Sequence, residues 1–128
     1  MRFPRKVYAI QHNVTKKIYI GSSNDVETRY KSHIWALRGN KHNVPDMQED
    51  YNKYGEDYSV FILGEMSSYA EKGLEYEWMR KYNTITRGVG YNYKDQERVI
   101  SHSVNYVPYK DGLPEKAADI GQAPDRIS

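Results

Sequence analysis

The sequence contains no cysteine, which excludes disulfide bonds and thiolate-ligated metal sites. No apolar run approaches the roughly 18 residues that a membrane-spanning helix needs. The basic N-terminal stretch, MRFPRK, is not followed by the apolar segment of a secretory signal. A chain of 128 residues fits one domain with a modest core. These absences favour a soluble domain without a membrane partner, with the cytoplasm as its expected compartment.

Acidic residues are scarce at the beginning of the chain. Residues 1–41 contain 9 Lys and Arg but only 2 Asp and Glu, whereas the counts are 5 and 9 in residues 42–92 and 5 and 6 in residues 93–128. Basic side chains gain affinity for nucleic acid by displacing the counterions condensed on its phosphates. The first third is therefore either a nucleic-acid-binding surface or an ordinary solvated basic face.

Short segments rich in β-branched and aromatic residues predict three strands. Residues 5–11 (RKVYAIQ) and 17–21 (KIYIG) flank the polar stretch HNVTK and predict an antiparallel hairpin. Residues 58–66 (YSVFILGEM) predict a third strand.

Capping residues and apolar spacing predict three helices. The first begins near Ser23 or Asn24, with Asn24 as the cap and Glu27 three residues later, and it ends at Gly39. The second runs from about Pro45 to Tyr54, and the third follows a cap at Ser68 and continues to about Asn83. The order β-β-α-α-β-α predicts an α+β fold, a small domain with a three-stranded antiparallel sheet flanked by helices.

The helical and strand periodicity fades after GVGYN at residues 88–92. We predict a folded domain over residues 1–93 and a C-terminal extension over residues 94–128 that is partly irregular or disordered. Within the extension, residues 99–109 could add a strand or pack against the domain.

Four side chains near the predicted hairpin are candidates for phosphate chemistry. Arg29 and His33 are spaced i,i+4 on the first helix, where a guanidinium can bind a phosphate and an imidazole can move a proton. The alternative is an exposed pair on an ordinary amphipathic helix. Tyr8 and Tyr19 occupy the two hairpin strands and share a face if the hairpin register pairs them. The alternative for them is a cross-strand aromatic pair.

Glu75 is the candidate metal-binding carboxylate. It lies beside Leu74, at the boundary of the apolar stripe of the third helix. Carboxylate oxygen is the ligand that Mg²⁺ prefers, and one carboxylate with waters and substrate phosphate can complete a site. Glu71 and Glu77 compete for this role, and a solvated helix glutamate is the alternative. The histidines show no zinc-binding spacing, so a histidine-ligated metal site is not expected.

Taken in order, these residues resemble the GIY-YIG nuclease family over about residues 5 to 93. The first matching motif, Lys6-Val7-Tyr8, departs from the family pattern, because Lys6 stands where the family usually has Gly. We expect Lys6 to point outward from an edge strand. The matching motifs are Lys6-Val7-Tyr8, Tyr19-Ile20-Gly21, Ser22-Ser23, Arg29, His33, Leu37, Gly39, His42-Asn43, Met47-Gln48, Tyr54-Gly55, Glu75, and Gly90-Tyr91-Asn92.

The resemblance implies a metal-dependent DNA endonuclease of the homing or phage type that leaves 5′-phosphate and 3′-hydroxyl ends. It implies that Glu75 holds one Mg²⁺ or Mn²⁺ ion, and that Tyr8 is the general base with His33 relaying its proton. Tyr19 would position water or phosphate, and Arg29 would neutralise the transition state. His42 and Asn92 would be supporting residues. Candidate DNA contacts are Lys16, Lys17, Lys31, Arg38 and Lys41.

The resemblance leaves several alternatives open. A restriction or phage-defence nuclease and a structure-specific nickase belong to the same family. A non-catalytic nucleic-acid-binding or protein-binding module is a different class. DNA is the expected partner, with a homodimer or a targeting protein as a possible source of specificity. The resemblance places the protein in the cytoplasm of a bacterium or of a phage-infected host.

Overall fold

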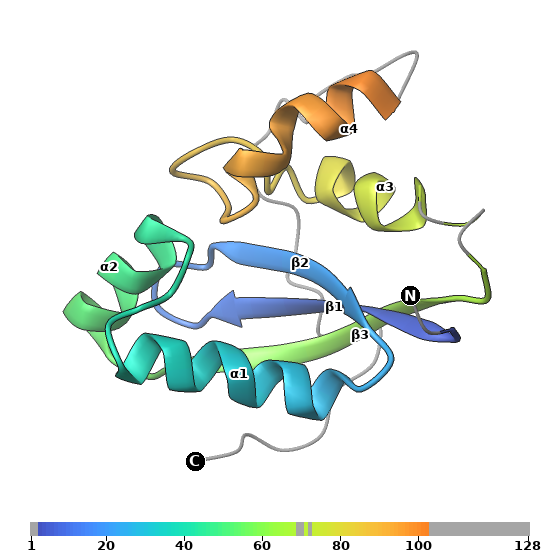
Figure 1. Cartoon of the computed structure of the whole chain (residues 1–128). Helices are drawn as coiled ribbons and strands as arrows, with labels where there is room; N and C mark the ends of the chain where they lie inside the picture. Colours follow the sequence, from blue (N-terminus) through green and yellow to red (C-terminus); the bar gives the residue numbers. More distant parts are fainter. Residues whose placement is uncertain (1–2, 69–70, 72, 103–128) are drawn as a thin grey trace.

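A computed structural model describes residues 3–68, 71 and 73–102 of the chain. A three-stranded antiparallel sheet lies between two pairs of helices, α1 and α2 on one side and α3 and α4 on the other (Figure 1). The predicted α+β class and the order of the first six elements are confirmed. The elements are β1 (Arg5–His12), β2 (Ile18–Ser23), α1 (Val26–Arg38), α2 (Pro45–Tyr54), β3 (Tyr58–Met66), α3 (Gly73–Lys81), the 3₁₀ turn η2 (Tyr93–Asp95) and α4 (Gln96–His102).

The sheet order is β2-β1-β3, so β1 is the central strand. Strands β1 and β2 form the predicted hairpin, in which Tyr8 pairs with Gly21 and Ile10 pairs with Tyr19. The expectation that Lys6 lies on an edge strand is therefore wrong. Its side chain is exposed although the strand is paired on both sides at this residue, with Ser23 of β2 and Glu65 of β3.

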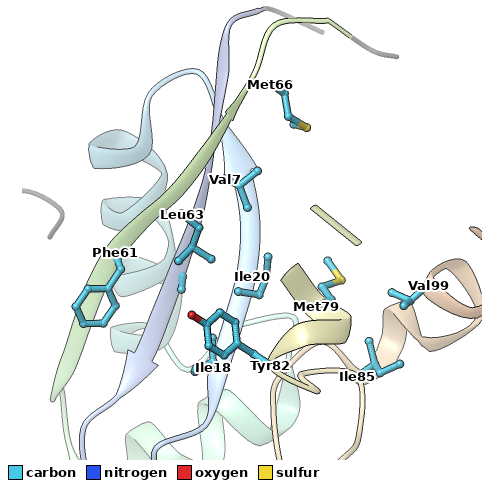
Figure 2. Packing of buried hydrophobic residues seen from close by; sticks show 11 residues of the cluster. Val7, Ile18, Ile20, Phe61, Leu63, Met66, Met79, Tyr82, Ile85 and Val99 are labelled. Carbon is cyan, nitrogen blue, oxygen red and sulfur yellow. The ribbon is translucent and has the colours of Figure 1, made fainter. Parts of the chain in front are cut away.

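Alternating residues of the sheet feed two separate hydrophobic cores. The first core, on the α3 and α4 side, is shown in Figure 2 and contains Val7, Ile18, Ile20, Leu63, Met79 and Val99 among others. The second core, on the α1 and α2 side, contains Tyr8, Ile10, Val26, Tyr30, Ile34 and Leu37 among others. Burying one large aliphatic side chain contributes about 1.5–3 kcal/mol, so both layers stabilise the sheet.

Two helix starts differ from the prediction. Asp25, not Asn24, caps α1, and its side chain accepts a hydrogen bond from the backbone N–H of Thr28. The cap shifted by one residue because Asp and Asn are equally good N-caps, and the fold selects between them. Helix α3 begins at Gly73, later than the predicted start after Ser68.

Helix α4 lies in the segment where the sequence predicts a partly irregular extension. Its Val99 is 1% exposed and packs in the first core. A seven-residue helix with a single buried apolar side chain is too short to produce a visible periodicity. The rest of the extension, residues 103–128, lies outside the described residues. None of the helices in the described part is long and apolar enough to cross a membrane.

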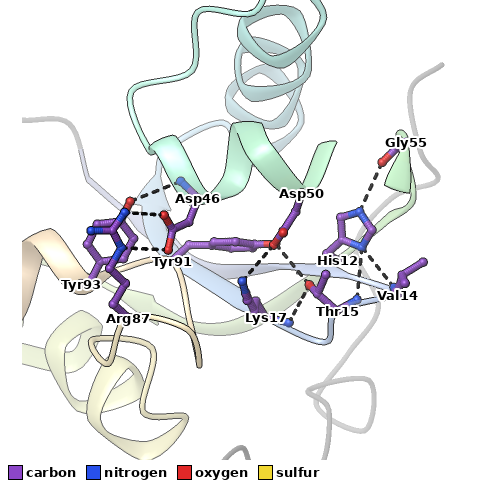
Figure 3. Close-up of polar contacts among 10 residues, drawn as sticks. All are labelled: His12, Val14, Thr15, Lys17, Asp46, Asp50, Gly55, Arg87, Tyr91 and Tyr93. Carbon is purple, nitrogen blue, oxygen red and sulfur yellow. Dashed lines mark hydrogen bonds and ion pairs between the residues drawn. The ribbon is translucent and has the colours of Figure 1, made fainter. Parts of the chain in front are cut away.

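A buried polar cluster ties the hairpin turn to α2 (Figure 3). The Tyr91 hydroxyl donates to Asp50 at 2.7 Å, and Lys17 forms an ion pair with the same carboxylate at 3.3 Å. His12 is buried beside this cluster, accepts from the N–H of Val14 at Nδ1, and lies 3.3 Å from the Gly55 carbonyl oxygen through Nε2. Both ring nitrogens of His12 are thus used inside the protein, which indicates a structural role for this histidine.

Candidate active site

The rings of Tyr8 and Tyr19 lie on the same face of the hairpin, although the register does not pair the two residues with each other. Their centroids are 6.4 Å apart and their planes are tilted by 36°. Because Tyr8 pairs with Gly21, its ring lies across the β2 backbone, and a Cβ atom at Gly21 would be only 2.5 Å from Tyr8 Oη. The missing side chain at Gly21 therefore makes room for the Tyr8 phenol.

Tyr8 begins a row of buried polar groups that runs from the sheet into the loop before α2. Its Oη lies 3.2 Å from Nε2 of His33, and Nδ1 of His33 lies 2.8 Å from Nε2 of His42. Nδ1 of His42 in turn accepts a hydrogen bond from the backbone N–H of Val44 at 3.0 Å. Each histidine thus uses both ring nitrogens inside the protein.

The loop that carries His42 is held by Gln48, a buried residue in the first turns of α2. The side-chain oxygen of Gln48 accepts from the N–H of His42 at 3.0 Å, and its nitrogen donates to the carbonyl oxygen of Leu37 at 2.9 Å. Lys94 adds a bond of 2.6 Å from Nζ to the carbonyl oxygen of Asn43. The position of the His42 ring is therefore set by α2 and by the end of α1.

Arg29 lies one turn before His33 on α1 and is exposed. Arg29 lines an open pocket. The lining contains two cationic side chains, Arg29 and Lys41, together with polar side chains and the two buried histidines. Such a lining suits an anionic group, because cations and N–H donors bind phosphate oxygens. The lining residues are Arg29, Ser32, His33, Ala36, Lys41, His42 and Asn43.

Burial and neighbouring charges set the protonation states of the row. Burial raises the pKa of Tyr8 well above its ordinary range, and Tyr19 adds to the rise, whereas the Arg29 guanidinium lowers it. Burial lowers the pKa of His33 to about 3, with His42 and Arg29 adding to the shift, and burial lowers the pKa of His42 to about 4. At neutral pH both histidines are therefore neutral, and Tyr8 needs further positive charge nearby to become a phenolate.

Glu75 approaches the row from the opposite side of the sheet, at the end of β2. Its Oε2 accepts a hydrogen bond from the Ser22 hydroxyl at 3.1 Å. Its charge raises the pKa of both Tyr8 and Tyr19 as a minor contribution, so Glu75 lies within electrostatic range of the two phenols. Glu75 is half-buried, whereas Glu77, two residues along α3, is exposed.

The donor set at Glu75 fits a hard divalent cation. Among the described residues, no group of three or more His, Asp or Glu side chains is arranged to hold a metal. A single half-buried carboxylate suits Mg²⁺ or Mn²⁺, because Mg²⁺ keeps several waters and takes its other ligands from substrate phosphate. The set does not suit a structural zinc ion, which needs four protein ligands.

Asn92 lies against the outer edge of β2, away from the pocket. Its side-chain oxygen accepts from the N–H of Ile20 at 2.7 Å, and its side-chain nitrogen donates to the carbonyl oxygen of Ile20 at 3.0 Å. Ile20 lies between Tyr19 and Gly21, so the amide of Asn92 fixes the strand that carries them. Its side chain also donates to Asp95 at 3.3 Å.

The basic residues predicted to contact DNA lie in different surroundings. Lys41 lines the pocket, and Lys16 is exposed in the hairpin turn with φ of 68°. The other three form ion pairs: Lys17 with Asp50 at 3.3 Å, Lys31 with Glu27 at 4.0 Å, and Arg38 with Glu56 at 2.7 Å.

Comparisons with known proteins agree with this fold. Residues 5–92 match the family described as the GIY-YIG catalytic domain. The chain is 31% identical over 119 residues to Intron-associated endonuclease 1 of Enterobacteria phage T4, and the match covers 91% of this chain and 47% of that protein. The chain therefore spans about half the length of this relative.

Two solved structures are similar to this one. One is the catalytic domain of the homing endonuclease I-TevI, with a TM-score of 0.61, 27% identity, and coverage of 68% of this chain and 95% of that chain. The other is a mutant of the catalytic domain of intron endonuclease I-TevI, with a TM-score of 0.63, 27% identity, and coverage of 71% and 94%.

A small antiparallel sheet with helices on both faces defines an α+β domain, and two phenols, two histidines, an arginine and a carboxylate lie around one end of its hairpin. The structural likeness confirms the fold class. The chain belongs to the GIY-YIG family, as its match over residues 5–92 shows.

Sequence reasoning assigned no role to three groups that organise this site: the Gln48 side chain, the Ser22 hydroxyl and the Val44 N–H. Gln48 and Ser22 occur in the matched motifs, and that membership is the signal by which they could have been found. A backbone N–H leaves no trace in a sequence at all.

Proposed function

We propose that this protein is a metal-dependent DNA endonuclease that hydrolyses phosphodiester bonds to 5′-phosphate and 3′-hydroxyl ends. The observation that supports this most strongly is the convergence of five predicted side chains within the matched family region: Tyr8, Tyr19, Arg29, His33 and Glu75. The names of the relatives, which describe intron and homing endonucleases, support DNA as the substrate.

In this proposal the scissile phosphate lies between Arg29 and Glu75, in front of the two phenols. Tyr8 is the general base: as a phenolate it takes a proton from the attacking water, whose oxygen then bonds to phosphorus while the bond to the 3′ oxygen breaks. Arg29 stabilises the charge that develops on the phosphate oxygens, and Tyr19 orients the water or the phosphate. Arg29 also lowers the pKa of Tyr8, which favours the phenolate.

Glu75 would hold one Mg²⁺ or Mn²⁺ ion. The bound ion would supply positive charge to the scissile phosphate and to the 3′ leaving oxygen. The Ser22 hydroxyl orients the carboxylate by its bond of 3.1 Å to Oε2. A hydrogen-bond partner of this kind fixes the direction in which a ligating oxygen points.

The test compares two glutamates of α3. The purified 128-residue chain is incubated with supercoiled plasmid DNA and Mg²⁺ or Mn²⁺. We expect cleavage by the parent protein, none with EDTA, and none by Glu75→Ala. The matched control, Glu77→Ala, removes an exposed carboxylate from the same helix and should cleave normally. Full activity of Glu75→Ala would refute the assignment of the metal-binding carboxylate.

A map of cleavage sites distinguishes the nuclease classes. One fixed site on plasmid and linear DNA indicates a homing or restriction enzyme, scattered nicks indicate weak specificity, and preference for branched DNA indicates a structure-specific nickase. Specificity could also come from a homodimer or from a targeting protein that binds this domain. A module that only binds nucleic acid would instead show salt-sensitive DNA binding without metal-dependent products.

A further inference from the structure

The N–H group of Val44 faces a buried histidine nitrogen. Its nitrogen lies 3.0 Å from Nδ1 of His42, and Val44 is 5% exposed. A backbone N–H group can only donate a hydrogen bond, so Nδ1 of His42 is the acceptor. A neutral imidazole carries one proton, which must then be on Nε2 of His42.

The direction of this first bond determines the next two. Nε2 of His42 lies 2.8 Å from Nδ1 of His33 and donates to it. Nδ1 of His33 is therefore an acceptor, and the proton of His33 is on Nε2, which lies 3.2 Å from Tyr8 Oη. The Tyr8 oxygen thus accepts a hydrogen bond from His33.

A second proton on either ring would place two donors against each other. On His42 the extra N–H would face the N–H of Val44, and on His33 it would face the N–H of His42. The geometry therefore requires both rings to be neutral. The low pKa values that burial gives to His33 and His42 agree with this requirement.

The loop is held so that the Val44 N–H keeps this direction. Gln48 binds both the N–H of His42 and the carbonyl oxygen of Leu37, and these two bonds also fix which atom of its amide is oxygen. Helix α2 starts directly after Val44, at Pro45. The donor at the end of the row is therefore part of a supported backbone and does not depend on a side-chain rotamer.

We propose that the Val44 amide fixes the direction of the row Val44–His42–His33–Tyr8, so that His33 donates to Tyr8 and His42 is the positioning residue that selects this tautomer. The catalytic meaning of this proposal rests on the proposed nuclease function. A donor at Oη stabilises negative charge on Tyr8, whereas it cannot accept the Tyr8 proton. The phenolic proton therefore leaves by a route other than a relay through His33.

The tautomers are measured directly with long-range ¹H–¹⁵N correlation spectra of the ¹⁵N-labelled full chain at neutral pH. We expect both His33 and His42 to carry their proton on Nε2. Tyr8→Phe removes the hydroxyl but should leave both tautomers unchanged, because the direction is set at Val44. Val44→Ala keeps the N–H and should also leave them unchanged. A proton on Nδ1 of either histidine in the parent protein would overturn the proposal, and so would a change of tautomer in Tyr8→Phe.

The kinetic test removes the intermediate donor. In His42→Phe, Nδ1 of His33 no longer accepts a hydrogen bond from His42. We therefore expect the ¹⁵N signals of His33 to report a mixture of tautomers. We also expect kcat to fall by about 10²-fold, as for loss of an oriented donor. KM for plasmid DNA should change by less than about threefold if the effect is on the transition state. An unchanged kcat in folded His42→Phe would contradict the positioning role. If the parent protein does not cleave DNA at all, the proposed function fails, while the tautomer spectra still decide the direction of the row.

Discussion

Gly21 offers a direct test of how the site is packed. Adding a methyl group in Gly21→Ala places Cβ 2.5 Å from Oη and 2.7 Å from Cζ of Tyr8, and 3.1 Å from Cε1 of Tyr19. Ordinary contact begins near 3.4 Å, so the Tyr8 ring has to move by about 0.9 Å. Tyr8 is 1% exposed and is packed in the second core, which leaves little free space for this movement.

The expected consequences follow from this displacement. Overpacking of a core typically costs about 1–3 kcal/mol, so the free energy of unfolding should fall by that amount. The bond between Tyr8 and His33 is already 3.2 Å long, and a displacement of about 1 Å away from His33 breaks it. Misplacing a catalytic group by about 1 Å can cost on the order of 10²-fold in rate. We therefore expect kcat for plasmid cleavage to fall by about 10²-fold.

Urea denaturation measures the stability, and the rate of plasmid cleavage at saturating DNA measures kcat. Gly39→Ala is the matched control, because a Cβ at Gly39 has its nearest contact at 3.4 Å, with the carbonyl oxygen of Trp35. Near-parental stability and kcat in Gly21→Ala would refute the view that Tyr8 needs the space above Gly21. Loss of activity in Gly39→Ala as well would show that the assay reports general destabilisation.

Three further predictions test other parts of the structure. Arg29→Ala should lower kcat for plasmid cleavage by about 10²-fold or more while leaving the urea midpoint nearly unchanged, because Arg29 is exposed; normal cleavage would exclude Arg29 from transition-state stabilisation. Tyr91→Phe removes the 2.7 Å bond to buried Asp50 and should cost about 1–3 kcal/mol in urea denaturation with kcat unchanged within about threefold; unchanged stability would show that this cluster does not hold the hairpin turn. The pKa of His33 is lowered to about 3 in the folded state, so the unfolded chain takes up a proton first as pH falls, and His33 alone should decrease stability by up to about 1.4 kcal/mol per pH unit from about pH 6.5 downward, to which His42 adds. His33→Gln should have a shallower slope between pH 6 and 4, and equal slopes would contradict the pKa shift.

The secondary structure was largely predictable because it depends on local patterns. Val26, Tyr30, Ile34 and Leu37 recur at helical spacing in the sequence and are buried along α1, and Pro45 and Gly55 bound α2 as the capping rules predict. The cap of α1 was placed one residue too early, at Asn24 instead of Asp25. The short α4 was missed, since it depends on the contact of Val99 with α3 more than on its own sequence.

The candidate site was predictable as a set of residues but not as an arrangement. The order of motifs from Tyr8 to Asn92 pointed to the family, and the match over residues 5–92 confirms that membership. The sequence carries no geometric information that selects one glutamate of α3 as the metal-binding carboxylate. The structure shows that Glu75 is half-buried beside Ser22, whereas Glu77 points to solvent.

The sequence by itself determined the three strands, the approximate positions of the first three helices, and which family the chain resembles. These features follow from residue types at short spacings, and each is decided within a few turns of the chain. Only the tertiary structure decided that β1 is central, that Tyr8 lies across Gly21, and that the Val44 N–H faces His42. The direction of a hydrogen bond depends on which donor meets which acceptor in space. Here that donor is a backbone group, which is the same in every residue except proline.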